Sequence, residues 1–183
     1  MNYVEPIRDI DKIEDIHSDL LFHSQRDALM FSFGIYTGFR ISDILRFKVK
    51  DVMGNSYNMR EKKTNKQRVY EFNKYLKREI DEYIKGKNEN EFLFKSRKGV
   101  NRPITRQRAY QIIVEACHRN GVYNVGSHTL RKTFGYFLYQ KTKDVAMLMQ
   151  IFNHASPDIT LRYIGINQEI SNKTIGKLNF SGH

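Results

Sequence analysis

Apolar side chains recur every three or four residues along most of the chain, which is the spacing of one face of an α-helix. This pattern predicts a first helix over residues 9–21. A second helix is predicted to start after Ser24, an N-cap with Asp27 three residues later, and to end at Gly38, a frequent helix terminator. The same signals predict helices over residues 42–47, 74–85, 105–120, 128–141, 144–152, 157–164 and 167–178.

The period of the pattern changes between residues 51 and 73. Residues 57–60 and 68–72 alternate apolar and polar side chains as β-strands do, and residues 61–67 between them make a polar, basic hairpin tip. The chain is therefore predicted to have a mainly α fold with a small antiparallel β-sheet (α+β). Because no linker, repeat or low-complexity stretch divides the chain, residues 1–183 are expected to form a single domain, which the motifs described below make a catalytic one.

Charge narrows the class of partner. The chain carries 31 Lys+Arg against 20 Asp+Glu, a net charge of +11, and its pI is about 9.7. Such an excess of basic residues usually indicates a nucleic-acid partner, because basic side chains displace the counterions condensed on nucleic acid. A secreted cationic protein or a membrane-surface protein could have the same net charge. The single Cys117 fits a reducing cytoplasm, and no apolar run reaches the ~18 residues of a membrane span. We expect a cytoplasmic, nucleoid-associated protein with no membrane partner.

Two arginines are candidates for holding a phosphate. A phosphodiester under attack gains negative charge on its non-bridging oxygens, and guanidiniums can meet that charge through paired hydrogen bonds. Arg40 lies at the junction of two predicted helices, and Arg131 lies one helical turn after His128. The alternative, an ordinary surface ion pair, describes most arginines in so basic a chain.

A proton donor and a nucleophile are also needed. Lys63 at the hairpin tip is the candidate donor to a leaving hydroxyl, with Lys62 and Lys66 as competitors and plain solvation as the alternative. Tyr163 is the candidate nucleophile, although a buried aromatic on a short helix is the alternative for it. Its phenol, with an ordinary pKa of about 10, would need nearby arginines and an acceptor such as His128.

His154 completes the candidates, as a donor to a phosphate oxygen or, alternatively, as a histidine interacting with the dipole of a helix C-terminus. Zinc is disfavoured, because the histidines lack a His-x-x-x-His spacing and have no paired cysteines or carboxylate cluster beside them. Magnesium is disfavoured because no closely spaced acidic pair lies near the basic motifs. The sequence predicts neither metal nor cofactor.

At these spacings the chain resembles the catalytic domain of the tyrosine recombinase (phage integrase) family over about residues 24–178. Thr-Gly-Phe-Arg-Ile-Ser-Asp at residues 37–43 is similar to the family's first motif, and residues 62–68 are similar to its β-hairpin, an alignment that selects Lys63. His-Thr-Leu-Arg at residues 128–131 matches its His-x-x-Arg box. Asn-His-Ala-Ser at residues 153–156 resembles its Gly-His-Ser motif, and a tyrosine follows His154 by nine residues, where the nucleophile belongs.

The resemblance implies a site-specific DNA recombinase, or integrase, of a mobile genetic element that uses neither metal nor ATP. Its tyrosine would attack the scissile phosphate to form a 3′-phosphotyrosyl link, and a 5′-hydroxyl from a partner strand would later reverse the step. The implied roles are nucleophile for Tyr163, phosphorane stabilisation for Arg40, Arg131 and His154, proton donation for Lys63, handling of the tyrosine proton for His128, and support for Asp43.

The implied partner is double-stranded DNA, bound by a homotetramer on two sites, with accessory DNA-bending or excision proteins as further partners. We expect the helix opening at Thr105 to approach the major groove. The side chains expected on DNA are Lys62, Lys66, Arg68, Arg102, Thr105, Arg106, Arg108 and Lys132. Residues 166–183 would either pass to a neighbouring protomer or pack on their own domain.

The chain departs from the family pattern in three places. Asn153 replaces a common glycine, which is benign because Asn tolerates a left-handed C-cap, and Lys132 stands where histidine is frequent. Since only about 23 residues precede Ser24, the family's usual N-terminal core-binding domain is expected to be absent, whether the chain is an excised catalytic fragment or a naturally minimal recombinase. Two other functions stay open: a type IB topoisomerase-like relaxing enzyme with the same tyrosine chemistry, and a non-catalytic DNA-binding regulator on the same fold.

Overall fold

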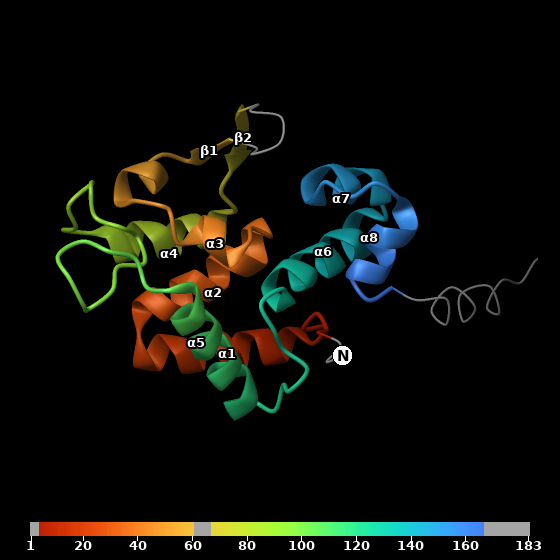
Figure 1. Ribbon diagram of the computed structural model, residues 1–183, viewed down its shortest axis with the longest axis horizontal. Helices are drawn as coiled ribbons and strands as arrows, with labels where there is room; N and C mark the ends of the chain where they lie inside the picture. Colours follow the sequence, from red (N-terminus) through yellow and green to blue (C-terminus); the bar gives the residue numbers. More distant parts are fainter. Residues whose placement is uncertain (1–3, 61–66, 167–183) are drawn as a thin grey trace, which may run out of the picture.

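The computed structural model describes residues 4–60 and 67–166, and it is built mainly of helices (Figure 1). The elements are α1 (Ile10–His23), α2 (Gln25–Thr37), α3 (Ile41–Ile44), the 3-10 helix η1 (Val49–Val52), β1 (Ser56–Arg60), β2 (Gln67–Glu71), α4 (Lys74–Ile84), α5 (Arg106–Arg119), α6 (Thr129–Thr142), α7 (Val145–Phe152) and α8 (Pro157–Tyr163). The predicted mainly α fold with a small antiparallel sheet is confirmed. The helix predicted over residues 167–178 lies outside the described residues.

Local capping signals fix most helix ends where the sequence predicts them. Ser24 accepts a hydrogen bond from the Asp27 amide at 3.4 Å, and Gly38 ends α2 in the left-handed region with φ 65°. Thr105 caps α5, and Ser156 caps α8, in which Pro157 takes the first helical position. These ends matter because Gly38 and Ser156 stand beside the residues predicted to carry chemistry.

Two apolar clusters hold the molecule together, and α6 lies between them (Figure 1). The larger cluster joins α1 to α5 and the base of the hairpin, and Leu130 of α6 belongs to it. The smaller cluster is centred on Leu148, Phe152 and Ile164, and Phe134 of α6 packs against it. Because α6 serves both clusters, its first turns lie at their boundary.

The hairpin projects from the larger cluster. Strand β1 pairs antiparallel with β2, with Ser56 opposite Glu71 and Tyr57 opposite Tyr70. The rings of Tyr57 and Tyr70 stack with centroids 5.5 Å apart, and Tyr57 is buried in the core. The base of the hairpin is therefore anchored. Of the predicted tip, Gln67 begins β2, and residues 61–66 lie outside the described part of the chain.

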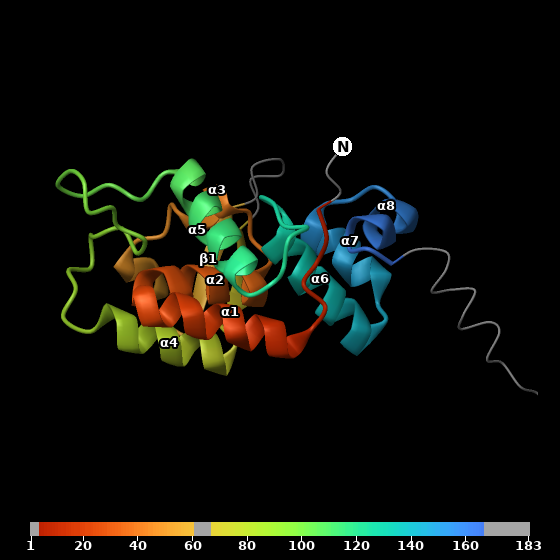
Figure 2. The ribbon, with the colours of Figure 1, turned by 90° about the horizontal axis from the view of Figure 1, so that it is seen from below.

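The segment before α1 runs along α6 and reaches α8 (Figure 2). The amide of Ile7 donates to the Thr133 hydroxyl at 2.9 Å, and Arg8 donates to the carbonyl of Gly165 at 3.3 Å. Ile7 itself is buried in the larger cluster. This segment therefore connects the two clusters through contacts that no local sequence pattern predicts.

One local prediction needs correction, and one short helix was not predicted. The short helix predicted over residues 42–47 is α3, Ile41–Ile44, because the chain turns afterwards to bury Leu45 and Phe47. The ring of Phe47 lies 5.0 Å from that of Phe33, centroid to centroid, in the aromatic core. The helix η1 was not predicted from the sequence, and it is held by a long-range hydrogen bond from the Val49 amide to the Glu91 carbonyl at 2.9 Å.

Candidate active site

The turn between α2 and α3 presents Arg40. Gly38 adopts a left-handed conformation, and a Cβ added to it would overlap the ring of Phe134. Glycine is therefore required both by the backbone and by the space. Arg40 follows as the N-cap residue of α3, with an exposed side chain. The turn thus directs one guanidinium outward from the start of a packed helix.

The first turn of α6 carries His128 and Arg131. The Arg131 side chain is buried, with 7% of the residue exposed, and its guanidinium donates a hydrogen bond to the Gly38 carbonyl. Its Cζ atom also lies 4.4 Å from the centroid of the Phe152 ring. The hydrogen bond links Arg131 to the turn that bears Arg40, so two segments far apart in sequence are fixed to one another.

The corner between α7 and α8 places His154 and leads to Tyr163. Asn153 ends α7 with φ 57° and ψ 49°, the left-handed C-cap that its side chain type tolerates. The Nδ1 atom of His154 lies 3.2 Å from the Thr160 hydroxyl oxygen, a buried threonine of α8. This contact orients the imidazole from the same short helix that carries the tyrosine.

Tyr163 ends α8 among the other candidates. Its hydroxyl oxygen lies 3.0 Å from Nδ1 of His128, and its ring centroid lies 5.0 Å from that of His154 in an edge-on arrangement. The ammonium of Lys132 lies 5.3 Å from the same ring centroid. The structure thus brings residues of the second half of the chain to one phenol.

Burial, followed by the charges of Arg131 and Arg40, lowers the pKa of both imidazoles. Burial is the main cause that lowers the pKa of His128, and the charges of Arg131, Arg40 and Lys132 lower it further. The pKa of His154 is lowered by burial first and then by the same two guanidiniums. Both imidazoles are therefore mainly neutral at neutral pH and can accept a proton.

The pKa of the Tyr163 phenol is shifted in the opposite direction, upward. Burial raises the pKa of Tyr163, whereas the positive charges of Arg131 and Arg40 lower it. Because burial is the largest cause, the free phenol keeps its proton at neutral pH, and the neutral His128 imidazole can accept that proton. Burial lowers the pKa of the Arg131 guanidinium, and the negative charge of Asp43 acts against that shift. The arrangement suits a nucleophile activated only when a base takes its proton.

The structure therefore brings together Arg40, Arg131, His128, His154 and Tyr163, with Asp43 close enough to act electrostatically on Arg131. The predicted proton donor Lys63 and its neighbours Lys62 and Lys66 lie outside the described residues. Arg68 lies in β2, opposite Met59.

The other residues expected on DNA lie at the start of α5 and on α6. Arg102, Arg106 and Arg108 are exposed, while Thr105 is engaged as the N-cap of α5 and accepts from the Arg108 amide at 3.1 Å. Lys132 donates to the carbonyl of Val4 at 2.6 Å. The lysine ammonium is thus tied to the segment before α1.

One residue beside the site was missed from the sequence. Phe152 is buried, and its ring contacts Arg131, His154 and Tyr163. Its position directly before the Asn-His-Ala-Ser motif was a signal, because a large apolar residue there must pack beneath the corner that the motif forms. Its apolar character alone predicted a core position and no contact with a guanidinium.

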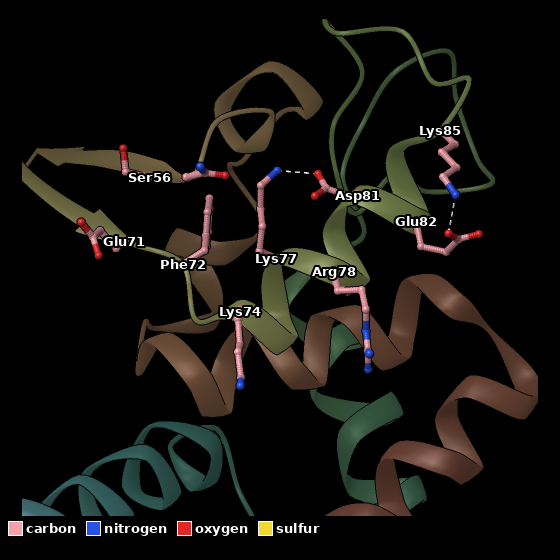
Figure 3. A pocket seen from close by; sticks show the side chains of 10 residues that line it. Ser56, Glu71, Phe72, Lys74, Lys77, Arg78, Asp81, Glu82 and Lys85 are labelled. Atoms are coloured by element: carbon pink, nitrogen blue, oxygen red, sulfur yellow. Dashed lines mark hydrogen bonds and ion pairs between the residues drawn. The ribbon is translucent and has the colours of Figure 1, made fainter.

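A hollow between the hairpin base and α4 lies elsewhere on the molecule (Figure 3). It has a volume of about 770 Å³. Lys77 there pairs with Asp81, and Lys85 pairs with Glu82 (Figure 3). None of the candidate catalytic side chains lines it, so this hollow is separate from the cluster around Tyr163.

Two further properties concern only the described residues. Residues 4–60 and 67–166 contain no group of three or more His, Cys, Asp or Glu side chains arranged to hold a metal ion. Within the same ranges, no helix is both long and apolar enough to cross a membrane.

Comparison with known proteins gives the family and the fold of the chain. Residues 9–169 match the model of the phage integrase family. The chain belongs to this family. The probable integrase/recombinase YoeC of Bacillus subtilis (strain 168) is 48% identical over 170 residues, which cover 92% of this chain and 93% of YoeC. The tyrosine recombinase XerH of Campylobacter jejuni is 31% identical over 157 residues, which cover 80% of this chain and 42% of XerH.

Solved structures of tyrosine recombinases share the fold. The crystal structure of XerA recombinase superposes with a TM-score of 0.76 at 20% identity, over 96% of this chain and 65% of that one. XerH bound to palindromic difH substrate in a post-cleavage complex gives a TM-score of 0.69 at 20% identity, over 97% of this chain and 54% of XerH. YoeC apart, this integrase-family chain spans about half the length of the curated relatives it matches, as XerC of Staphylococcus epidermidis illustrates at 54%. Neither the topoisomerase nor the regulator alternative is favoured by these relatives.

Proposed function

We propose that the chain is the catalytic domain of a site-specific DNA recombinase that cleaves and rejoins DNA strands through a tyrosine. The observation that carries the proposal is the 3.0 Å contact between the Tyr163 hydroxyl and Nδ1 of His128. The charges of Arg131 and Arg40 act on the same phenol. A phenol facing both a neutral base and two cations is equipped to attack an anionic phosphorus centre.

The proposed first step is an exchange of one ester for another. The Tyr163 oxygen forms a bond to the phosphorus as its proton passes to His128, and the bond from phosphorus to the 5′-oxygen breaks. The leaving oxygen takes a proton to become a 5′-hydroxyl, and the phosphate stays on the tyrosine as a 3′-phosphotyrosyl ester. A 5′-hydroxyl of another strand reverses the step, so bond energy is retained without ATP.

The arginines and His154 have the complementary role in this proposal. Arg40 and Arg131 would each donate to non-bridging oxygens, and His154 would add a donor as negative charge develops. Asp43 would support Arg131 through its charge. Lys63, which lies outside the described residues, would protonate the 5′-oxygen as the hairpin reaches over the DNA.

DNA binding would use the exposed start of α5 and the hairpin. Arg102, Arg106 and Arg108 are exposed, so their guanidiniums are available to phosphates or to base edges in a major groove. Lys62, Lys66, Arg68 and Lys132 are proposed to add backbone contacts, and Thr105 to help present the helix start. The net charge of +11 supports a partner of this kind.

We propose a homotetramer on two DNA sites as the assembly that exchanges strands. The DNA-bound XerH structure supports double-stranded DNA as the partner of a domain with this fold. In this assembly, residues 166–183 would pass from one protomer to the next. Accessory DNA-bending or excision proteins would take part in strand exchange. The protein would act at the nucleoid. The single-domain organisation over residues 1–183 is part of the same proposal.

The proposal is tested with a library of synthetic duplexes that carry a nick at a fixed position and randomised sequence around it. A nick lets the short fragment bearing the 5′-hydroxyl diffuse away, so cleavage is trapped as covalent protein–DNA. The protein is incubated with the library in EDTA, and adducts that survive SDS are recovered and sequenced. The proposal predicts enrichment of one sequence in the adduct fraction.

The matched variants are Tyr163→Phe and Tyr123→Phe. Tyr123 is exposed, and its ring also packs near an imidazole, with a centroid 5.5 Å from that of His118. Tyr163→Phe should abolish the adduct while DNA binding persists, and Tyr123→Phe should leave both intact. An adduct that survives in Tyr163→Phe refutes the assigned nucleophile, and a wild-type protein that binds duplexes of the library without forming any adduct refutes the enzymatic function.

A further inference from the structure

The ring of Phe152 lies where three candidate catalytic side chains meet. Phe152 ends α7, only 1% of the residue is exposed, and it belongs to the smaller apolar cluster. Its centroid lies 5.3 Å from that of Tyr163 and 5.4 Å from that of His154. The same ring also lies against the guanidinium of Arg131, so it contacts three candidate catalytic side chains at once.

The contact with Arg131 is a cation–π interaction. The guanidinium carbon lies 4.4 Å from the Phe152 centroid, well inside the range of about 6 Å over which a ring face attracts a cation. Because Arg131 is buried, water screens this attraction less than it would at a surface. The hydrogen bond to the Gly38 carbonyl holds the same guanidinium at another point. Two fixed contacts leave an extended cation little freedom to tilt.

The contacts with Tyr163 and His154 have a different geometry. The Tyr163 ring meets Phe152 at an interplanar angle of 68°, an edge-to-face arrangement, and the His154 ring is tilted by 52°. Such pairs prefer defined angles, because the edge of one ring is positive and the face of the other is negative. One benzene ring can therefore hold a cation and orient two neighbouring rings.

The surroundings leave room for this ring and little else. A Cβ added to Gly135 would lie 2.7 Å from both Cε2 and Cζ of Phe152, so a side chain at Gly135 would push the ring from its place. Phe134 packs on another side, with its centroid 6.2 Å away. The seat of the ring is thus shaped by α6, which also carries Arg131 and His128.

We propose that Phe152 is a positioning residue for strand cleavage: its face holds the Arg131 guanidinium, and its packing against the rings of Tyr163 and His154 orients both side chains. This inference rests on the proposed function of the site. It predicts that the electron density of the ring, and not merely its volume, governs the rate at which the tyrosine attacks.

The test replaces Phe152 with phenylalanines that carry one, two or three fluorine atoms on the ring, introduced at this position alone. Fluorine withdraws electron density from the ring face and weakens its attraction for a cation while adding little volume. The full chain is used with the nicked duplex recovered from the library. The single-turnover rate of adduct formation should fall stepwise with each fluorine, to about one tenth with three, while affinity for the duplex stays unchanged.

The matched control is the set of singly fluorinated phenylalanines with the fluorine at the ortho, meta or para position, which withdraw about the same electron density but add their volume at different places. Loss of rate through crowding would make the isomers differ in rate. The proposal predicts nearly equal rates for them. A flat rate across the fluorinated series, or a fall explained by size alone, overturns it.

A second measurement separates this inference from the enzymatic proposal. In the DNA-free protein, the Nε proton of Arg131 should resonate upfield because of the ring current, and Phe152→Leu should move it downfield. If the unsubstituted protein forms no adduct, the proposed function fails, and this resonance still decides whether the ring holds the guanidinium. An Arg131 signal that does not move in Phe152→Leu overturns the contact itself.

Discussion

The Nδ1 atom of His128 lies 3.0 Å from the hydroxyl oxygen of Tyr163, across 35 positions of sequence. The pKa of His128 is lowered by burial and by neighbouring cations, and the pKa of Tyr163 is raised mainly by burial. The stable pairing at neutral pH is therefore a neutral imidazole that accepts from a protonated phenol. Attack by the phenol then requires the imidazole to be unprotonated.

This relationship predicts how the rate depends on pH. Because protonated His128 cannot accept a proton, adduct formation should fall as the pH drops through its pKa, which lies below the ordinary value of about 6.5. The rate should then stay level through neutral pH. Single-turnover adduct formation measures the profile, and His128→Ala should be slower by about 10²- to 10⁴-fold. An acidic limb that remains unchanged in His128→Ala would assign it to another group, with His154→Ala as the next variant to measure.

Arg131 should tolerate no replacement by another cation. Its guanidinium donates to the Gly38 carbonyl and lies over Phe152, and lysine cannot make both contacts while also gripping a phosphate through two parallel bonds. We expect Arg131→Lys and Arg131→Ala to lower the cleavage rate by at least about 10²-fold. Near-normal cleavage by Arg131→Lys would show that charge alone suffices there.

Arg40 offers a cleaner separation of chemistry from stability, because its side chain is exposed. Arg40→Ala should cleave at least about 10²-fold more slowly while its melting temperature stays close to that of the wild type. The matched control is Arg46→Ala, which removes an exposed arginine a few residues later in the chain. Equal rate losses in the two variants would indicate a general effect of charge on DNA binding.

Asn153 should be replaceable by glycine and not by alanine. It ends α7 with φ 57°, a conformation that costs an ordinary L-residue about 1–2 kcal/mol and glycine almost nothing. Asn153→Ala should therefore lower the free energy of unfolding by about 1 kcal/mol, and Asn153→Gly should leave it nearly unchanged. Denaturant unfolding followed by circular dichroism measures both. Equal stability of the two variants would contradict a role for the left-handed cap.

The elements that the sequence predicted well are those fixed by local physics. Ser24 and Gly38 bound α2 as expected, because a capping oxygen and a left-handed glycine act within one turn of helix. The helix η1 was missed because a long-range hydrogen bond to Glu91 holds it. Phe92 forms an isolated antiparallel bridge with Lys48, another contact between residues far apart in sequence that no local pattern predicts.

The residues of the candidate site also divide into those that the sequence predicted and those that only the structure reveals. Arg40, His128, Arg131, His154 and Tyr163 were predicted from motif order and spacing, and the fold brings them together. Phe152 was missed, since an apolar residue before a motif reads as core until the guanidinium over its face is seen. The contact of Lys132 with Val4 was also beyond the sequence, because it depends on a segment that approaches α6 from the other end of the chain.

The central claim is that the oxygen of Tyr163 opens the DNA backbone. It is tested most directly by digesting the adduct with nuclease and protease and identifying the linked amino acid and nucleotide by mass spectrometry. The account predicts a nucleotide joined through its 3′-phosphate to the phenolic oxygen of Tyr163, with a free 5′-hydroxyl on the released strand. A link to any other residue, or a link through a 5′-phosphate, would contradict it.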